Sequence, residues 1–118
     1  NYGHTLAHAV EKIEDYSWRH GEAVGVGMVY VAELARLLGK IDDALVEQHR
    51  RVLQAIGVPV SYRSDAWPEL RAAMSLDKKT RGSTLRFVVL NGLGSAEICS
   101  GPDEEILAAA YARLSAVS

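Results

Sequence analysis

The chain has 118 residues, of which 48% are hydrophobic and 24% are charged, a balance that excludes a disordered chain and predicts one soluble domain with one core. The formal net charge is −2 with both signs mixed, so no basic field is present and we expect no nucleic-acid partner.

The same composition favours a cytoplasmic protein without a membrane span. The longest apolar run, residues 23–32, is shorter than the ~20 residues that cross a bilayer. Cys99 is the only cysteine and cannot form a disulfide within the chain, which favours a reducing compartment. No basic region leads into an apolar stretch after Asn1, so we expect no signal peptide and a chain cut from a longer protein.

The first two predicted elements are helices. Residues 5–14 show an apolar face at helical spacing, and the opposite face carries His4, His8 and Glu11. Residues 22–38 are apolar in nearly every direction, which is typical of a central, buried helix.

A third helix is expected from Asp42 or Asp43, either of which can cap it, to about residue 56, before Gly57. The positions of its predicted apolar stripe are Leu45, Val46, Val52, Leu53 and Ile56. His49 falls on this stripe, and we interpret it as a packed core histidine.

The last third of the chain combines helix and strand signals. Residues 68–76 predict a short helix, and "DKKTRG" after it is interpreted as a polar loop. "TLRFVVL" and "SAEIC" flank the turn sequence "NGLG" and predict a β-hairpin. A final helix follows Pro102, with a buried stripe formed by Ile106, Leu107, Ala110, Tyr111 and Leu114. The fold class is therefore mainly α, multihelical, with a small hairpin.

Three of the four histidines lie between residues 4 and 20. His4 and His8 are four residues apart, so a helix would place them on one face about 6 Å from each other, close enough to share a metal or a substrate. His20 adjoins Gly21 at an expected helix start, where glycine leaves room for a ligand near the backbone. The alternative is a solvated polar face and a histidine in a surface turn.

Two imidazoles rarely hold a catalytic zinc ion alone, because such sites usually have three protein ligands and one open position. Glu11 either completes the set or orients a ligand, since it shares the helix face of His4 and His8. Glu22 lies too near His20 in sequence to be an obvious donor. A third ligand from outside this chain is the remaining alternative.

The basic cluster in "DKKTRG" consists of Lys78, Lys79 and Arg81. Lysine binds a phosphate or carboxylate as a point charge, and arginine binds it as a fork. Solvated loop charge is the alternative interpretation.

Taken in order, "NYGHTLAHAVE", "WRHGEAVGVGM" and "DKKTRG" resemble the C-terminal domain of 3-dehydroquinate synthase, of the actinobacterial type. The resemblance covers essentially the whole chain and implies a single helical metal- and substrate-binding domain over residues 1–118. It also implies that the NAD-binding α/β domain of such enzymes precedes Asn1 and is absent here, so no NAD-binding residue is assigned in this chain. Ala7 departs from the family, which usually has glycine there.

The resemblance implies a lyase of the shikimate pathway, on the route to chorismate and the aromatic amino acids. Such an enzyme converts the sugar acid phosphate 3-deoxy-D-arabino-heptulosonate 7-phosphate into 3-dehydroquinate and phosphate. It uses NAD and a divalent metal, zinc or cobalt, to oxidise a hydroxyl, eliminate phosphate, reduce the ketone again and close the ring.

The resemblance also assigns roles to residues. His4 and His20 are metal ligands, and His8 is the catalytic histidine that meets the substrate and assists proton transfer near the phosphate. Asn1, Lys78 and Lys79 are assigned contacts with the substrate, and the two lysines are also assigned a catalytic role. The sequence does not decide between the two lysines. The third metal ligand, a glutamate, precedes this segment in the family.

We therefore expect the isolated chain to bind metal weakly and to be inactive. Its partners would be the N-terminal domain of the same protein and, through an exposed apolar face, a second copy in a homodimer. Three alternatives stay open: another sugar phosphate cyclase, an iron-dependent alcohol dehydrogenase domain, and a helical interaction module without catalytic ancestry.

Overall fold

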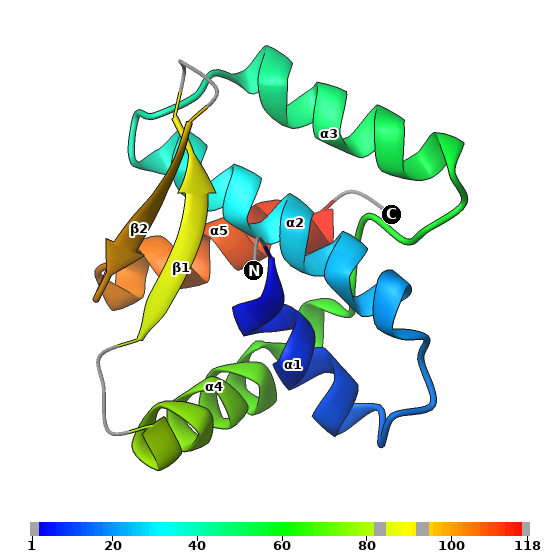
Figure 1. Cartoon of the computed structure of the whole chain (residues 1–118), viewed down its shortest axis with the longest axis vertical. Helices are drawn as coiled ribbons and strands as arrows, with labels where there is room; N and C mark the ends of the chain where they lie inside the picture. The colour runs from blue at the N-terminus through cyan, green and yellow to red at the C-terminus, as the bar shows by residue number, and fades with distance from the viewer. Residues whose placement is uncertain (1–2, 82–84, 92–94, 117–118) are drawn as a thin grey trace.

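The computed structural model describes residues 3–81, 85–91 and 95–116, with side chains for the same ranges except residues 76–81 and 116. This part of the chain is mainly helical with one hairpin, as expected (Figure 1). Its elements are α1 (His4–Ile13), α2 (His20–Leu37), α3 (Asp43–Ala55), the 3-10 helix η1 (Ser64–Ala66), α4 (Trp67–Arg81), β1 (Arg86–Leu90), β2 (Ala96–Ser100) and α5 (Glu104–Ala116). None of the helices in these ranges combines the length and apolarity needed to cross a membrane.

Helix α2 is the centre of the fold. It contacts α1, α3, α5 and β1, while α4 packs on the other side of α1 (Figure 1). The run from Val29 to Ala35 is almost entirely inaccessible to solvent, which confirms the predicted buried helix. The helix begins at His20, two residues earlier than expected.

The N-terminus of α1 lies directly on the backbone of α2. Gly3 has φ 78°, in the left-handed region, and a Cβ placed on Gly27 would lie 1.9 Å from the Gly3 carbonyl oxygen. Ala7 is fully buried at the same contact, so its methyl group is accommodated. Two glycines therefore allow the start of α1 to approach α2 more closely than any side chain would permit.

Helix α3 begins as expected, because the Asp42 side chain accepts a hydrogen bond from the Leu45 amide at 3.0 Å. The predicted stripe is wrong at two positions: Val52 is 56% exposed and Ile56 is 69% exposed. The reason is that α3 packs mainly on α2, which covers only a narrow strip of it. That strip follows Val46, Arg50 and Leu53.

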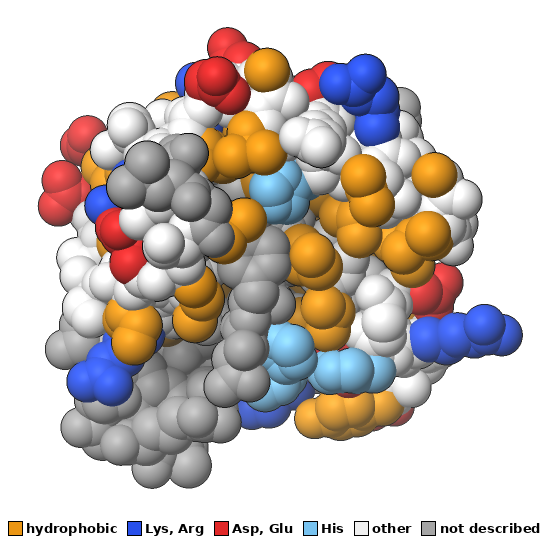
Figure 2. Space-filling model, turned by 45° about the horizontal axis from the view of Figure 1, so that its top comes forward, with side chains coloured by type: hydrophobic (Ala, Val, Ile, Leu, Met, Phe, Trp, Pro, Cys, Tyr) orange, Lys and Arg blue, Asp and Glu red, His pale blue; other side chains and the backbone are white. Residues whose placement is uncertain are grey.

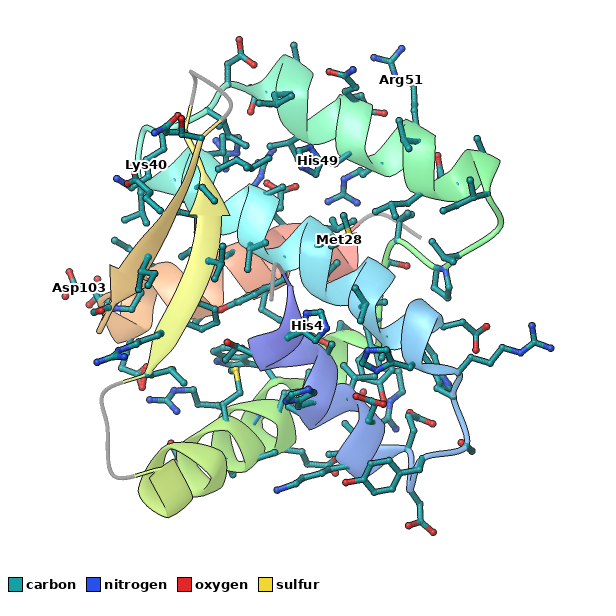
Figure 3. All side chains as sticks on the ribbon, viewed as in Figure 1. His4, Met28, Lys40, His49, Arg51 and Asp103 are labelled. Atoms are coloured by element: carbon teal, nitrogen blue, oxygen red, sulfur yellow. The ribbon has the colours of Figure 1, made fainter. Side chains whose placement is uncertain are left out.

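His49 is not a core residue, contrary to the sequence interpretation. It is half-buried, its Nδ1 lies 2.8 Å from the carbonyl oxygen of Leu45, and it lines a groove of 280 Å³ between α2 and α3. Met28 lines the groove from the α2 side (Figure 3). Apolar side chains surround an imidazole on this face of the molecule (Figure 2).

Helix α4 is longer than predicted. It continues to Arg81, so the polar loop expected at "DKKTRG" is wrong for residues 77–81. Lysine and arginine are good helix formers, neither glycine nor proline interrupts these residues, and basic residues suit the C-terminal end of the helix dipole. The last residue of that motif, Gly82, lies outside the described residues.

The hairpin and α5 agree with the sequence prediction. Strands β1 and β2 pair antiparallel with Val88 opposite Ile98, and Phe87 and Val89 of β1 are buried. The turn residues 92–94 lie outside the described part. The α5 stripe is buried at Leu107, Ala110, Tyr111 and Leu114, while Ile106 is half-buried.

Tyr30 lies where α2, β1 and α5 meet. Its ring centroid is 5.8 Å from that of Phe87, and its hydroxyl donates a hydrogen bond to the Leu107 carbonyl at 2.9 Å. Burial raises the pKa of Tyr30 well above its ordinary value, so the hydroxyl keeps its proton and remains a donor. This bond ties α5 to the central helix.

A charged cluster is buried at the other end of α2. Glu33 and Arg50 are each 3% exposed, and Arg50 Nη2 donates to Glu33 Oε2 at 2.7 Å. Arg113 and Arg36 donate to the other carboxylate oxygen at 3.1 and 3.3 Å. Burial opposes ionisation of Glu33, but the three guanidinium groups outweigh it and lower the pKa of the carboxyl group.

Candidate metal centre

Three imidazoles meet where the N-termini of α1 and α2 come together. His4 is the first residue of α1, His8 lies one turn further, and His20 is the first residue of α2. The ring centroid of His4 is 5.7 Å from that of His8 and 5.4 Å from that of His20 (Figure 3, where His4 is labelled). The structure therefore brings together the three histidines that the sequence singled out.

The turn between α1 and α2 reverses the chain and returns it to the histidines of α1. Asp15 and Tyr16 have φ of 52° and 59°, in the left-handed region that residues other than glycine seldom adopt. The Tyr16 amide donates to the Glu11 carbonyl at 2.8 Å. This tight turn lets the first residue of α2 lie beside α1.

A side-chain cap fixes the start of α2. The Arg19 amide donates to Glu22 Oε1 at 2.9 Å. Glu22 is therefore occupied as a cap and is not directed to the imidazole of His20.

Glu11 contacts His20 across the turn. Glu11 Oε2 lies 3.2 Å from His20 Nδ1, and the Glu11 side chain is 14% exposed whereas that of His20 is 57% exposed. A carboxylate from α1 thus holds one ring nitrogen of the histidine on α2.

The donor set fits part of a metal site. Imidazole nitrogens are good ligands for zinc and cobalt, and His4 and His20 project together from two helix ends. Within the described ranges, no three histidine, cysteine, aspartate or glutamate side chains are arranged as a complete ligand set. The histidine pair thus needs a further ligand to form a catalytic centre.

The structure places the remaining predicted residues less completely. His8 is exposed on the histidine face of α1. Lys78 and Lys79 belong to the C-terminal part of α4, and their side chains lie outside the described part, as does Asn1 entirely.

Sequence reasoning missed Gly27 as a determinant of the site. Gly27 contacts Gly3, and this contact sets the position of His4, the residue directly after Gly3. The first turn of α1 is also fixed by Thr5, whose hydroxyl donates a hydrogen bond to the Arg86 carbonyl of β1 at 2.7 Å. The sequence did contain a signal for this contact, the pair Gly25 and Gly27 inside a strongly apolar helix. Glycine destabilises the interior of a helix, so its presence there indicates a place where another segment packs closely.

Solved structures share this fold. The 2-epi-5-epi-valiolone synthase ValA from Streptomyces hygroscopicus subsp. jinggangensis 5008, solved with NAD+ and Zn2+ bound, matches 96% of this chain with a TM-score of 0.84 and 25% identity, and the match covers 31% of ValA. A 2-deoxy-scyllo-inosose synthase complexed with carbaglucose-6-phosphate, NAD+ and Co2+ matches 95% of this chain with a TM-score of 0.75, at 24% identity and over 32% of its own length.

Curated relatives are more similar in sequence. The 3-dehydroquinate synthase of Thermobifida fusca (strain YX) is 57% identical over 118 residues, which are 100% of this chain and 32% of the relative. The 3-dehydroquinate synthase of Mycolicibacterium vanbaalenii is 59% identical over 114 residues, 97% of this chain and 32% of the relative. The chain thus spans about a third of the length of these relatives. The family model "3-dehydroquinate synthase C-terminal" matches residues 1–80, and the chain belongs to this family.

Proposed function

We propose that this chain is the C-terminal third of a 3-dehydroquinate synthase. The reaction is conversion of 3-deoxy-D-arabino-heptulosonate 7-phosphate into 3-dehydroquinate and phosphate, a carbon–oxygen lyase step of the shikimate pathway. The observation that carries the proposal is the meeting of His4 and His20 at two helix ends. Identity of 57% to a curated synthase along the whole chain supports it.

We propose NAD and a divalent metal, zinc or cobalt, as cofactors, because ValA was solved with NAD+ and Zn2+. When bound, they supply reversible hydride transfer and Lewis-acid polarisation of a substrate hydroxyl. His4 and His20 hold the metal through imidazole nitrogens. The third ligand and the NAD site come from the NAD-binding α/β domain that the family resemblance implies, which is the first partner of this chain.

His8 is proposed to act on protons next to the leaving phosphate. It is exposed and lies one helical turn from His4, so a substrate held at the metal site is within its reach. Once the substrate carries a ketone, the neighbouring C–H proton is acidic, and an imidazole can assist its transfer as phosphate departs. Asn1 and either Lys78 or Lys79 are proposed to bind the polar and anionic groups of the substrate.

Association with other protein surfaces is supported by the groove beside α3. Val52 and Leu45 line it together with Met28, and Val52 is 56% exposed. We propose a cytoplasmic enzyme in which this face is covered by the rest of the synthase or by a second copy in a homodimer.

The second candidate is another sugar phosphate cyclase, which the fold similarity to ValA favours. Identity of 25% to ValA against 57% to the Thermobifida synthase makes this the weaker proposal. A substrate comparison separates the two. Phosphate release by the full-length enzyme from the heptulosonate phosphate, but not from glucose 6-phosphate, which lacks a carboxylate, supports the synthase.

The first experiment is titration of this chain with zinc and cobalt by calorimetry. We expect weak binding that is lost in His4→Ala and in His20→Ala, because each removes one of the two imidazole ligands. The matched control is His49→Ala, which removes an imidazole from α3 outside the cluster and should leave binding unchanged.

A phosphate-release assay with NAD and the heptulosonate phosphate completes the test. The isolated chain should release none, since the described residues form no full ligand set and the proposed NAD site belongs to the N-terminal partner domain. Phosphate release by this chain alone would refute the fragment proposal. Metal binding that survives both histidine substitutions would refute the metal site.

A further inference from the structure

We infer that Glu11 is a positioning residue that orients His20 for metal binding, an inference that rests on the proposed function. Glu11 lies on α1 and His20 begins α2, so their contact spans the turn between the two helices. Glu11 Oε2 lies 3.2 Å from His20 Nδ1.

This geometry supports the orienting role, one of the two that the sequence left open for Glu11. The carboxylate lies at Nδ1, and the other ring nitrogen, Nε2, points to a different edge of the imidazole. A metal on Nε2 would bind the ring nitrogen that Glu11 does not contact. Glu11 supports the ligand instead of completing the ligand set.

The hydrogen bond also selects the useful form of the ring. When Nδ1 carries the proton and donates it to the carboxylate, Nε2 keeps the lone pair that a divalent cation requires. A carboxylate behind a metal-binding histidine fixes the ring orientation and makes the ligand more basic.

Burial shows which partner holds the other. The Glu11 side chain is 14% exposed, and its carbonyl accepts a hydrogen bond from Tyr16 at 2.8 Å, so both parts of the residue are fixed. The His20 side chain is 57% exposed and would sample several rotamers without a partner. The fixed carboxylate therefore determines where the exposed imidazole points.

The test measures metal affinity in the full-length synthase, by competition with a chelator, using Zn2+ and Co2+. Glu11→Ala should weaken Zn2+ binding by about 10–100-fold, the range typical of lost support to a metal-binding histidine. Glu11→Gln should recover part of this loss, because the amide oxygen still accepts from Nδ1. The absorption bands of bound Co2+ should shift in Glu11→Ala, since they report the ligand geometry.

The matched control is Asp15→Asn. Asp15 is exposed and lies in the same turn, and asparagine tolerates its left-handed backbone, so this variant removes a nearby negative charge without touching the imidazole. It should bind Zn2+ like the wild type.

Three results would overturn the inference: wild-type affinity in Glu11→Ala, an equal loss in Asp15→Asn, or an equal loss in Glu11→Gln and Glu11→Ala. The last two would mean that the metal requires negative charge and not an oriented ring. If His4→Ala and His20→Ala also leave Zn2+ binding unchanged, the proposed metal site itself fails. If those two weaken binding and Glu11→Ala does not, only the positioning role fails.

Discussion

At the scale of single residues, Glu33 and Arg50 are the two buried charges in the described part of the chain. The Glu33 carboxylate is buried on the central helix and accepts hydrogen bonds from arginines on α2, α3 and α5. A buried ion pair contributes little relative to apolar packing, but removing one partner leaves the other charged and buried. Arg50, itself 3% exposed, is the group that would be left without its carboxylate.

We therefore predict that Glu33→Gln lowers the free energy of unfolding by roughly 3–5 kcal/mol at neutral pH. The pKa of Glu33 is lowered in the fold, so its contribution is complete above about pH 4.5, the ordinary value, and is lost as the pH falls through the folded pKa. The stability difference between wild type and Glu33→Gln should narrow below that pH. Urea titrations across the pH range measure it.

The control for this prediction is Glu47→Gln, which removes an exposed carboxylate on α3 and leaves the pairing of Glu33 with Arg50 intact. It should cost under about 0.5 kcal/mol, as surface substitutions usually do. If the difference in free energy of unfolding between wild type and Glu33→Gln stayed constant from pH 3 to pH 7, the assignment of the Glu33 carboxylate as ionised and paired would be contradicted.

At the scale of elements, the crossing of α1 and α2 determines the geometry of the histidines. The contact is made by backbone atoms, because Gly3 and Gly27 face each other without side chains between them. His4 follows Gly3 directly, so any shift of this contact moves a proposed metal ligand. The precision of the site thus depends on two residues that carry no functional group.

Gly27→Ala should separate the two helices. The added Cβ would lie 1.9 Å from the Gly3 carbonyl oxygen, and only a movement of the backbone can remove this clash. We expect a loss of stability of about 1–3 kcal/mol, as in other overpacked cores, and weaker Zn2+ binding. Denaturant titration and calorimetry measure the two effects.

The matched control for stability is Gly21→Ala, because a Cβ built there meets nothing within 4 Å beyond its chain neighbours and the backbone of its own helix. This variant should keep stability near the wild-type value. Equal changes in stability in the two variants would show that helix propensity, and not the crossing of α1 and α2, accounts for the effect of Gly27→Ala.

The elements could largely be predicted from local sequence, whereas their contacts could not. Periodicity and caps predicted the helices and the hairpin, since these signals lie within a few residues of each other. Exposure of Val52 and burial of Glu33 depend on which helices lie opposite them, which one helix pattern does not contain. The pairing of Glu11 with His20 depends on a left-handed turn at Asp15 that lacks the usual glycine.

At the scale of the whole molecule, one core connects the proposed metal site with the C-terminal helix. α2 carries His20 at its first turn, and its later turns pack against β1 and α5. Tyr30 lies in this shared core and donates to Leu107 of α5. The family model ends at residue 80, whereas the match to the Thermobifida relative covers all 118 residues and so includes α5.

If α5 is part of one cooperative core, Leu107→Ala should lower the free energy of unfolding by about 2–5 kcal/mol, since Leu107 is 1% exposed and its removal leaves a cavity. The control is Glu104→Gln, three residues earlier on α5. Its exposed carboxylate lies 2.7 Å from Arg71 Nε, and removing this surface ion pair should lower the free energy of unfolding by at most about 1 kcal/mol. Urea unfolding followed by circular dichroism measures both.

The same experiment tests cooperativity. Loss of Leu107 packing should shift the whole transition, because the residues buried against α5 include Tyr30 on the central helix. A first transition confined to α5, with the remaining helices unfolding at the wild-type urea concentration, would contradict this. The contacts of α2 with α1, α3 and β1 would then persist without α5, and the metal site would not depend on the C-terminal helix.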